Sequence, residues 1–127
     1  MENTIEETKQ LIDAVVEGLH QVKGIDVVGI DLTEIPDTVT EHFIICHAES
    51  TTQVQSLAQN VIKVVRETTN EKVWHIEGMN NAQWVLLDYI NVVVHIFQSE
   101  YRTFYDIEGL WADAKQIKFE DSSTGKK

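Results

Sequence analysis

The strongest constraint on the fold of this chain comes from two short apolar segments between residues 84 and 97. Their sequences are WVLLDY and VVVHIF, and only Ile90 and Asn91 separate them. Two runs of this kind, joined by two residues, predict a β-hairpin. The valines at positions 92–94 do not alternate with polar residues, which is typical of a strand covered on both faces. We therefore expect a sheet with helices packed against it.

The first strand of this hairpin has two different faces, because successive side chains of a strand point to opposite sides. One face carries Trp84, Leu86 and Asp88, and the other carries Val85, Leu87 and Tyr89. Asp88 therefore lies in line with two large apolar side chains near a strand end. A mixed surface of this kind is typical of a recognition patch and also of a turn.

Two long helices are predicted upstream of the hairpin. Apolar residues at helical spacing predict the first over residues 5–22, where Gly18 weakens it and Gly24 is placed to end it. The second begins after Ser50, an N-cap candidate with Gln53 reaching back to it, and runs to about Thr68.

The remaining segments predict an α/β sandwich. Strands are expected over residues 25–32, 41–48 and 72–76, with loops over 33–40 and 77–81, and Asp106 can cap a last short helix. The predicted sheet is mixed and five-stranded, with helices packed on it. We assign residues 1–117 to a single domain and expect residues 118–127 to be a disordered tail.

Charge limits the classes of function that the chain can have. Its 127 residues include 21 acidic and 10 basic side chains, which gives a formal net charge of −11. A protein that binds nucleic acid by neutralising phosphates needs clustered lysine and arginine, whereas the basic residues of this chain are scattered. If it works near nucleic acid, we expect it to bind a basic protein there. The alternative is that the acidity serves only solubility.

Three features of the sequence bear on the cellular compartment of the protein. No apolar run approaches the roughly 20 residues that span a bilayer. The first ten residues, MENTIEETKQ, are acidic and resemble neither a signal nor a transit peptide. Cys46 is the single cysteine, and its apolar neighbours predict a buried thiol in a reducing compartment. We expect the cytoplasm.

The residues that could do chemistry do not form a convincing active site. His42 and His47 are five apart on a predicted strand and would point to opposite faces, so we expect no metal. Asp88 and His95 would allow an acid–base pair, but we favour a hydrogen bond that only orients the histidine. Cys46 is predicted to be buried, and the six glycines are isolated, so neither a nucleophile nor a phosphate loop is expected. We predict a protein that is not an enzyme and has no cofactor.

Several short segments, taken together, carry a family resemblance. They are WVLLD at 84–88, VVHIF at 93–97, Arg102, Tyr105, Leu110–Trp111, IDVV at 25–28, Asp31–Leu32, FII at 43–45, Ser50, Gln53 and Glu77–Gly78. In order and spacing, over residues 5–112, they resemble the ribosomal silencing factor family, also called Iojap.

The resemblance implies a regulator of translation. Members of this family bind ribosomal protein L-fourteen of the large subunit, on the face where the small subunit docks. They thereby block subunit joining and lower translation when nutrients are short, and some of them form homodimers. Their fold resembles that of nucleotidyltransferases. The catalytic motifs of those enzymes are missing here, because Ala48-Glu49-Ser50 stands at the comparable turn with no Asp-x-Asp.

Three places depart from the family pattern. Glu41-His42 replaces an Asp-Tyr pair, and residues 47–50 (HAES) replace a Gly-Thr-Ser type of turn. Ile90-Asn91 replaces Gly-Asp at the hairpin. A turn residue with positive φ is awkward for a β-branched side chain, so we expect Asn91 to take the left-handed position.

The resemblance and the charge together indicate a contact surface for a basic protein. The predicted contacts are Glu77, Trp84, Leu86, Asp88 and Tyr89, with Arg102 and Tyr105 shaping the edge. Plainer structural roles are also open: Trp84 could belong to the core, Asp88 could cap the turn, and Leu110-Trp111 could serve helix packing. His95 is taken as structural. Two other functions stay open, namely a residual nucleotidyltransferase or hydrolase and an acidic dimeric scaffold for another basic protein.

Overall fold

A six-stranded sheet forms the centre of the computed structural model, which describes residues 4–120. The strands lie in the order β3-β4-β5-β2-β1-β6, and among the described residues only β2 and β5 pair in parallel. The elements are α1 (Ile5–Gln21), β1 (Ile25–Asp31), β2 (His42–Ala48), α2 (Thr51–Thr69), β3 (His75–Glu77), β4 (Trp84–Asp88), β5 (Val92–Gln98), α3 (Ser99–Tyr105), α4 (Ile107–Leu110) and β6 (Lys115–Lys118).

The sixth strand corrects the predicted five-stranded sheet. β6 pairs antiparallel with β1, and all four of its residues are exposed, so it has no apolar alternation that the sequence could reveal. The chain stays ordered beyond it, because the Phe119 amide donates to the Val27 carbonyl at 2.8 Å. The predicted disordered tail is therefore wrong for residues 118–120. Residues 121–127 lie outside the described part of the chain.

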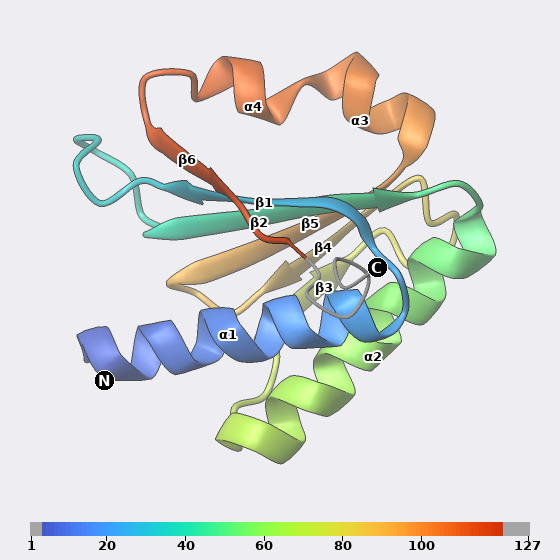
Figure 1. Cartoon of the computed structure of the whole chain (residues 1–127), viewed down its shortest axis with the longest axis horizontal. Helices are drawn as coiled ribbons and strands as arrows, with labels where there is room; N and C mark the ends of the chain where they lie inside the picture. Colours follow the sequence, from blue (N-terminus) through green and yellow to red (C-terminus); the bar gives the residue numbers. More distant parts are fainter. Residues whose placement is uncertain (1–3, 121–127) are drawn as a thin grey trace.

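Helices cover both faces of the sheet (Figure 1). α1 and α2 pack against one face and enclose the larger apolar core, which includes Leu11, Leu57 and Val94. α3 and α4 lie over the other face and enclose a smaller core around Ile45 and Phe97. β5 lies between the two cores, and its first six residues are buried, which confirms that this strand is covered on both sides.

Local hydrogen bonds set the ends of the two long helices. Thr4 caps α1 through a capping box with Glu7, and α1 ends at Gln21, before the predicted Gly24. Ser50 caps α2 as predicted, since its Oγ accepts from the Gln53 amide at 3.1 Å. The Gln53 side chain does not reach back to Ser50 but donates to the Val22 carbonyl, a contact with α1 that no local pattern encodes. No helix within residues 4–120 is long and apolar enough to cross a membrane.

The turn between β4 and β5 differs from the prediction. Ile90 takes the positive φ of 79°, whereas Asn91 does not. Asn91 is held by other contacts, because its Nδ2 donates to Thr8 Oγ1 at 2.7 Å and its carbonyl accepts from the Glu41 and His42 amides. These contacts tie the turn to α1 and β2. The left-handed conformation therefore falls on Ile90 despite its branched side chain.

Candidate protein-docking surface

The strand β4 alternates between the core and a partly exposed face. Val85 and Leu87 are buried against α1 and α2, whereas Trp84, Leu86 and Asp88 are only partly buried. This confirms the alternation predicted from the sequence.

The strand β3 extends this face at the edge of the sheet. Its register places Glu77 opposite Leu86 and His75 opposite Asp88, so these four side chains lie on one side. The strand was predicted over residues 72–76, but pairing with β4 shifts it and draws Glu77 out of the predicted loop. We call the surface formed by His75, Glu77, Trp84, Leu86, Asp88 and the adjacent Tyr105 the β4 face.

Trp84 both packs and remains partly accessible. Its indole stacks on Phe97 at a centroid distance of 5.1 Å and lies 4.7 Å from the ring of Tyr105. The indole Nε1–H donates to His95 Nδ1 at 3.1 Å. The alternative that Trp84 belongs to the core is therefore correct in part, whereas its role as a partner contact stays a prediction.

Asp88 has a local structural task. Its Oδ1 accepts from the Ile90 amide at 2.7 Å, which caps the turn, as the plainer alternative held. The register places Asp88 opposite Val93 and not His95, and the hydrogen bond of His95 goes to Trp84. The favoured hydrogen bond from Asp88 that would orient His95 is therefore wrong, and so is the possible acid–base pair of the two residues, because each makes a separate contact. Glu77 is exposed, and its Oε2 lies 2.8 Å from His75 Nε2.

Tyr89 does not belong to the β4 face. It is 4% exposed and packs in the core beneath α1 and α2, on the side of β4 that carries Val85 and Leu87. Burial, with a smaller effect from Glu71, raises the pKa of its hydroxyl. The structure thus contradicts the expectation that Tyr89 is available as a surface contact.

Arg102 is a buried anchor for α3. The residue is 9% exposed, and its Nη2 lies 2.6 Å from Glu108 Oε2. Nη1 donates to the carbonyls of Ile25 and Asp26, the latter at 2.7 Å, and lies 3.0 Å from His47 Nδ1. Burial and the adjacent guanidinium lower the pKa of His47, which keeps its nitrogen available as an acceptor. Arg102 is therefore too buried to act as the predicted surface contact, and its hydrogen bonds hold the helix that carries Tyr105.

Sequence reasoning missed two exposed aromatic side chains, Trp74, which is 69% exposed, and Phe104. Phe104 is 75% exposed, and its ring meets that of Tyr105 edge to face at 5.0 Å. It extends the row of rings from Trp84 outward along α3. The available signal for Phe104 was a large apolar side chain in the short charged and aromatic segment that follows β5. Leu110 is also 74% exposed, whereas Trp111 packs against Phe43, so the two residues differ in their roles.

Residues that could support catalysis are separated or buried. His42 and His47 lie on opposite faces of β2, as predicted, and within residues 4–120 no three His, Cys, Asp or Glu side chains gather in a metal-binding group. Cys46 is fully buried, and this burial raises the pKa of its thiol to about 12. Its thiolate, the reactive form, is therefore scarce at neutral pH.

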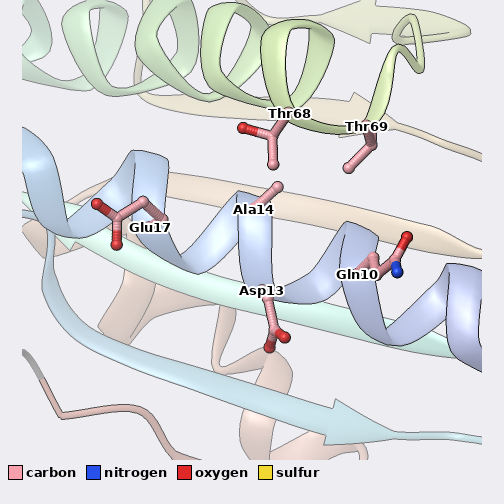
Figure 2. Close-up of a pocket in the computed structure, with 6 residues that line it drawn as sticks. All are labelled: Gln10, Asp13, Ala14, Glu17, Thr68 and Thr69. Atoms are coloured by element: carbon pink, nitrogen blue, oxygen red, sulfur yellow. The ribbon is translucent and has the colours of Figure 1, made fainter.

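A groove between α1 and α2 is a separate feature (Figure 2). It has a volume of about 540 Å³ and is lined by Gln10, Asp13, Ala14, Glu17, Thr68 and Thr69. Figure 2 shows Ala14 directed toward Thr68 between the helices, whereas the carboxylate of Asp13 points away from α2. None of the predicted contact residues lines this groove.

Comparison with known proteins agrees with the resemblance found in the sequence. The family model described as ribosomal silencing factor during starvation matches residues 5–127. The ribosomal silencing factor of Halalkalibacterium halodurans is 35% identical over 112 residues, which cover 88% of this chain and 94% of the relative. The factor of Bacillus subtilis is 39% identical over 89 residues, which cover 70% and 74%. A crystal structure of a Chromobacterium violaceum protein superposes with a TM-score of 0.77 at 30% identity and covers 82% of this chain and 85% of that one. The chain therefore belongs to the ribosomal silencing factor family.

Proposed function

We propose that this protein silences ribosomes by docking its β4 face on ribosomal protein L-fourteen of the large subunit. One observation carries the proposal. Trp84, Leu86 and Asp88 of β4 and Glu77 of β3 share a single, partly exposed face. An aromatic anchor surrounded by charged groups is the composition that dominates binding energy at protein interfaces.

Charge favours a basic partner for this face. Glu77 and Asp88 contribute carboxylates at the surface, and the whole chain has a net charge of −11. A protein that lies on ribosomal RNA is basic, so complementary potentials would speed its encounter with this chain and orient the two. Glu77 is available to pair with an arginine or a lysine, because its contact with His75 is exposed.

The mechanism would be steric and would need no turnover. A factor bound on the intersubunit face occupies surface that the small subunit requires. Inhibition should then be proportional to the fraction of large subunits that carry the factor. The likeness to nucleotidyltransferases stays a prediction, and so does the formation of a homodimer.

Co-sedimentation through a sucrose cushion tests the proposal. The purified protein is mixed separately with large subunits, small subunits and joined ribosomes. We expect stoichiometric pelleting with large subunits and none with the other two. Failure to pellet with large subunits at physiological salt would refute the proposal and leave an acidic scaffold for another basic protein as the alternative.

A matched pair of charge reversals locates the surface. Glu77→Lys changes the β4 face, and Glu17→Lys makes the same change in net charge on α1, across the sheet. We expect binding of L-fourteen to weaken at least tenfold for Glu77→Lys, about 1.4 kcal/mol, and to change much less for Glu17→Lys. Equal weakening would mean that only net charge matters and that docking uses another surface.

A further inference from the structure

His95 and Trp84 lie on neighbouring strands and share one hydrogen bond. The register of β4 and β5 places Trp84 opposite Phe97 and His95 opposite Leu86. The indole therefore reaches diagonally toward the histidine, and its Nε1–H donates to His95 Nδ1 at 3.1 Å. This bond joins the largest side chain of the β4 face to a residue that is 4% exposed.

The hydrogen bond determines where the imidazole carries its proton. Burial lowers the pKa of His95 to about 4, so the ring is neutral at physiological pH. A neutral imidazole has one donor and one acceptor nitrogen. Because Nδ1 accepts from Trp84, the proton resides on Nε2. Within the described part of the chain, Nε2 has no hydrogen-bond partner.

An unpaired buried N–H makes this histidine an unfavourable choice for packing alone. A buried polar group without a partner destabilises a fold, and an aliphatic residue in the middle of β5 would avoid that. The valines at positions 92–94 and Ile96 of the same strand are such residues. What the imidazole provides, and an aliphatic side chain cannot, is the acceptor for the indole of Trp84.

The imidazole is itself held in place. The ring of Phe43 on β2 meets it edge to face at a centroid distance of 4.6 Å, and the ring of Phe97 stacks 6.4 Å away. Its acceptor atom therefore has a fixed position.

The other neighbours of Trp84 do not distinguish one edge of the indole from the other. Phe97 and Tyr105 contact it through their rings, and these apolar contacts would tolerate a flipped indole. Only the bond to Nδ1 depends on where Nε1 lies.

We propose that His95 is a positioning residue whose Nδ1 fixes the orientation in which the Trp84 indole is presented to the protein partner. This inference rests on the proposed docking of L-fourteen through the β4 face. Binding then avoids the entropy that a freely reorienting indole would lose, which is the advantage of a preorganised anchor.

Two variants separate the acceptor from the packing. Asparagine and leucine have nearly the same shape, and only asparagine places an acceptor near the position of Nδ1. We expect His95→Leu to bind L-fourteen about fivefold more weakly than wild type and His95→Asn to stay within about twofold. Unchanged binding in both variants would overturn the inference, and so would equal weakening, because equal weakening indicates a packing role alone.

Nuclear magnetic resonance supplies a readout that needs no partner. The indole Nε1–H signal of Trp84, assigned through Trp84→Phe, should lie downfield and exchange slowly in wild type and in His95→Asn. In His95→Leu it should move upfield and exchange faster. A long-range nitrogen spectrum of the unmodified protein should show His95 protonated on Nε2, and protonation on Nδ1 would overturn the inference even if neither variant folds.

The two proposals fail in different ways. If wild type does not bind L-fourteen, the proposed function is refuted, and the docking role of His95 is refuted with it. If wild type binds and the leucine and asparagine variants bind equally, the proposed function stands and only the positioning role is refuted.

Discussion

The anchor of α3 gives the most quantitative prediction, through the substitution Arg102→Met. A helix of seven residues is not stable by itself, so tertiary contacts must hold it. Methionine retains much of the apolar stem but removes the hydrogen bonds to Glu108, His47 and two main-chain carbonyls. Loss of one partner from a buried ion pair destabilises a protein by about 3–5 kcal/mol.

Partial exposure of the carboxylate reduces that figure. The Arg102 side chain is 10% exposed and that of Glu108 is 26%, so water can replace part of the lost interaction. We therefore expect the free energy of unfolding to fall by about 3 kcal/mol. Adding Glu108→Leu to this variant should recover part of the loss, because no unpaired carboxylate would then remain in the site.

Urea denaturation followed by circular dichroism measures this effect. Lys9→Met is the matched control, because it breaks the pair of Lys9 with Asp13, whose side chains are 69% and 64% exposed. That control should leave the unfolding midpoint unchanged. A decrease of less than 1 kcal/mol for Arg102→Met, near that of the control, would refute the view that this network holds α3 to the sheet.

Three further predictions concern histidine burial, helix packing and the hairpin turn. Burial lowers the pKa of His95 to about 4, so its contribution to stability is complete above pH 6.5 and is lost as the pH falls toward 4. The loss relative to pH 7 should amount to about 2 kcal/mol at pH 5. Urea denaturation at pH 7 and pH 5 should therefore show a smaller decrease in stability for His95→Leu than for wild type. Gly18→Ala should destabilise the folded protein by about 1 kcal/mol despite the better helix propensity of alanine, because the added Cβ would lie 3.0 Å from Val61 Cα. An increase in the thermal unfolding midpoint would contradict this prediction. Ile90→Gly should stabilise the folded protein by about 1 kcal/mol, because Ile90 has a φ of 79° and is 60% exposed. Asn91→Gly should destabilise it, because the substitution removes a side-chain hydrogen bond. A higher unfolding midpoint for Asn91→Gly than for Ile90→Gly would contradict the turn geometry.

Local patterns in the sequence were sufficient for most of the architecture. The spacing of apolar residues in α1 and α2, the cap at Ser50 and the period-two alternation of β4 all reflect interactions within one element, so they can be read without knowledge of the fold. The continuous apolar run of β5 likewise predicted a strand with a layer on each side.

Residues whose roles depend on distant partners were predicted less well. Arg102 was placed at the edge of the surface, yet it is buried against carbonyls 76 and 77 positions away. Tyr89 was assigned to the contact surface, but the strand periodicity that places Trp84 outside also places Tyr89 in the core. The bond of His95 to Trp84 crosses from one strand to the next and depends on a register that single-sequence patterns do not reveal.

The α/β class, the family and the strand whose partly exposed face we propose for docking could all be predicted from residue order and spacing, because each depends on local patterns. The edge strand β6 and the residue with the left-handed turn conformation could be identified only from the folded structure. β6 is held by main-chain pairing with β1 and has no apolar alternation of its own. The Asn91 side chain donates a hydrogen bond to Thr8 on α1, and Ile90 adopts the strained left-handed conformation instead. In both cases the deciding partner lies far away along the chain, where local propensity carries no information.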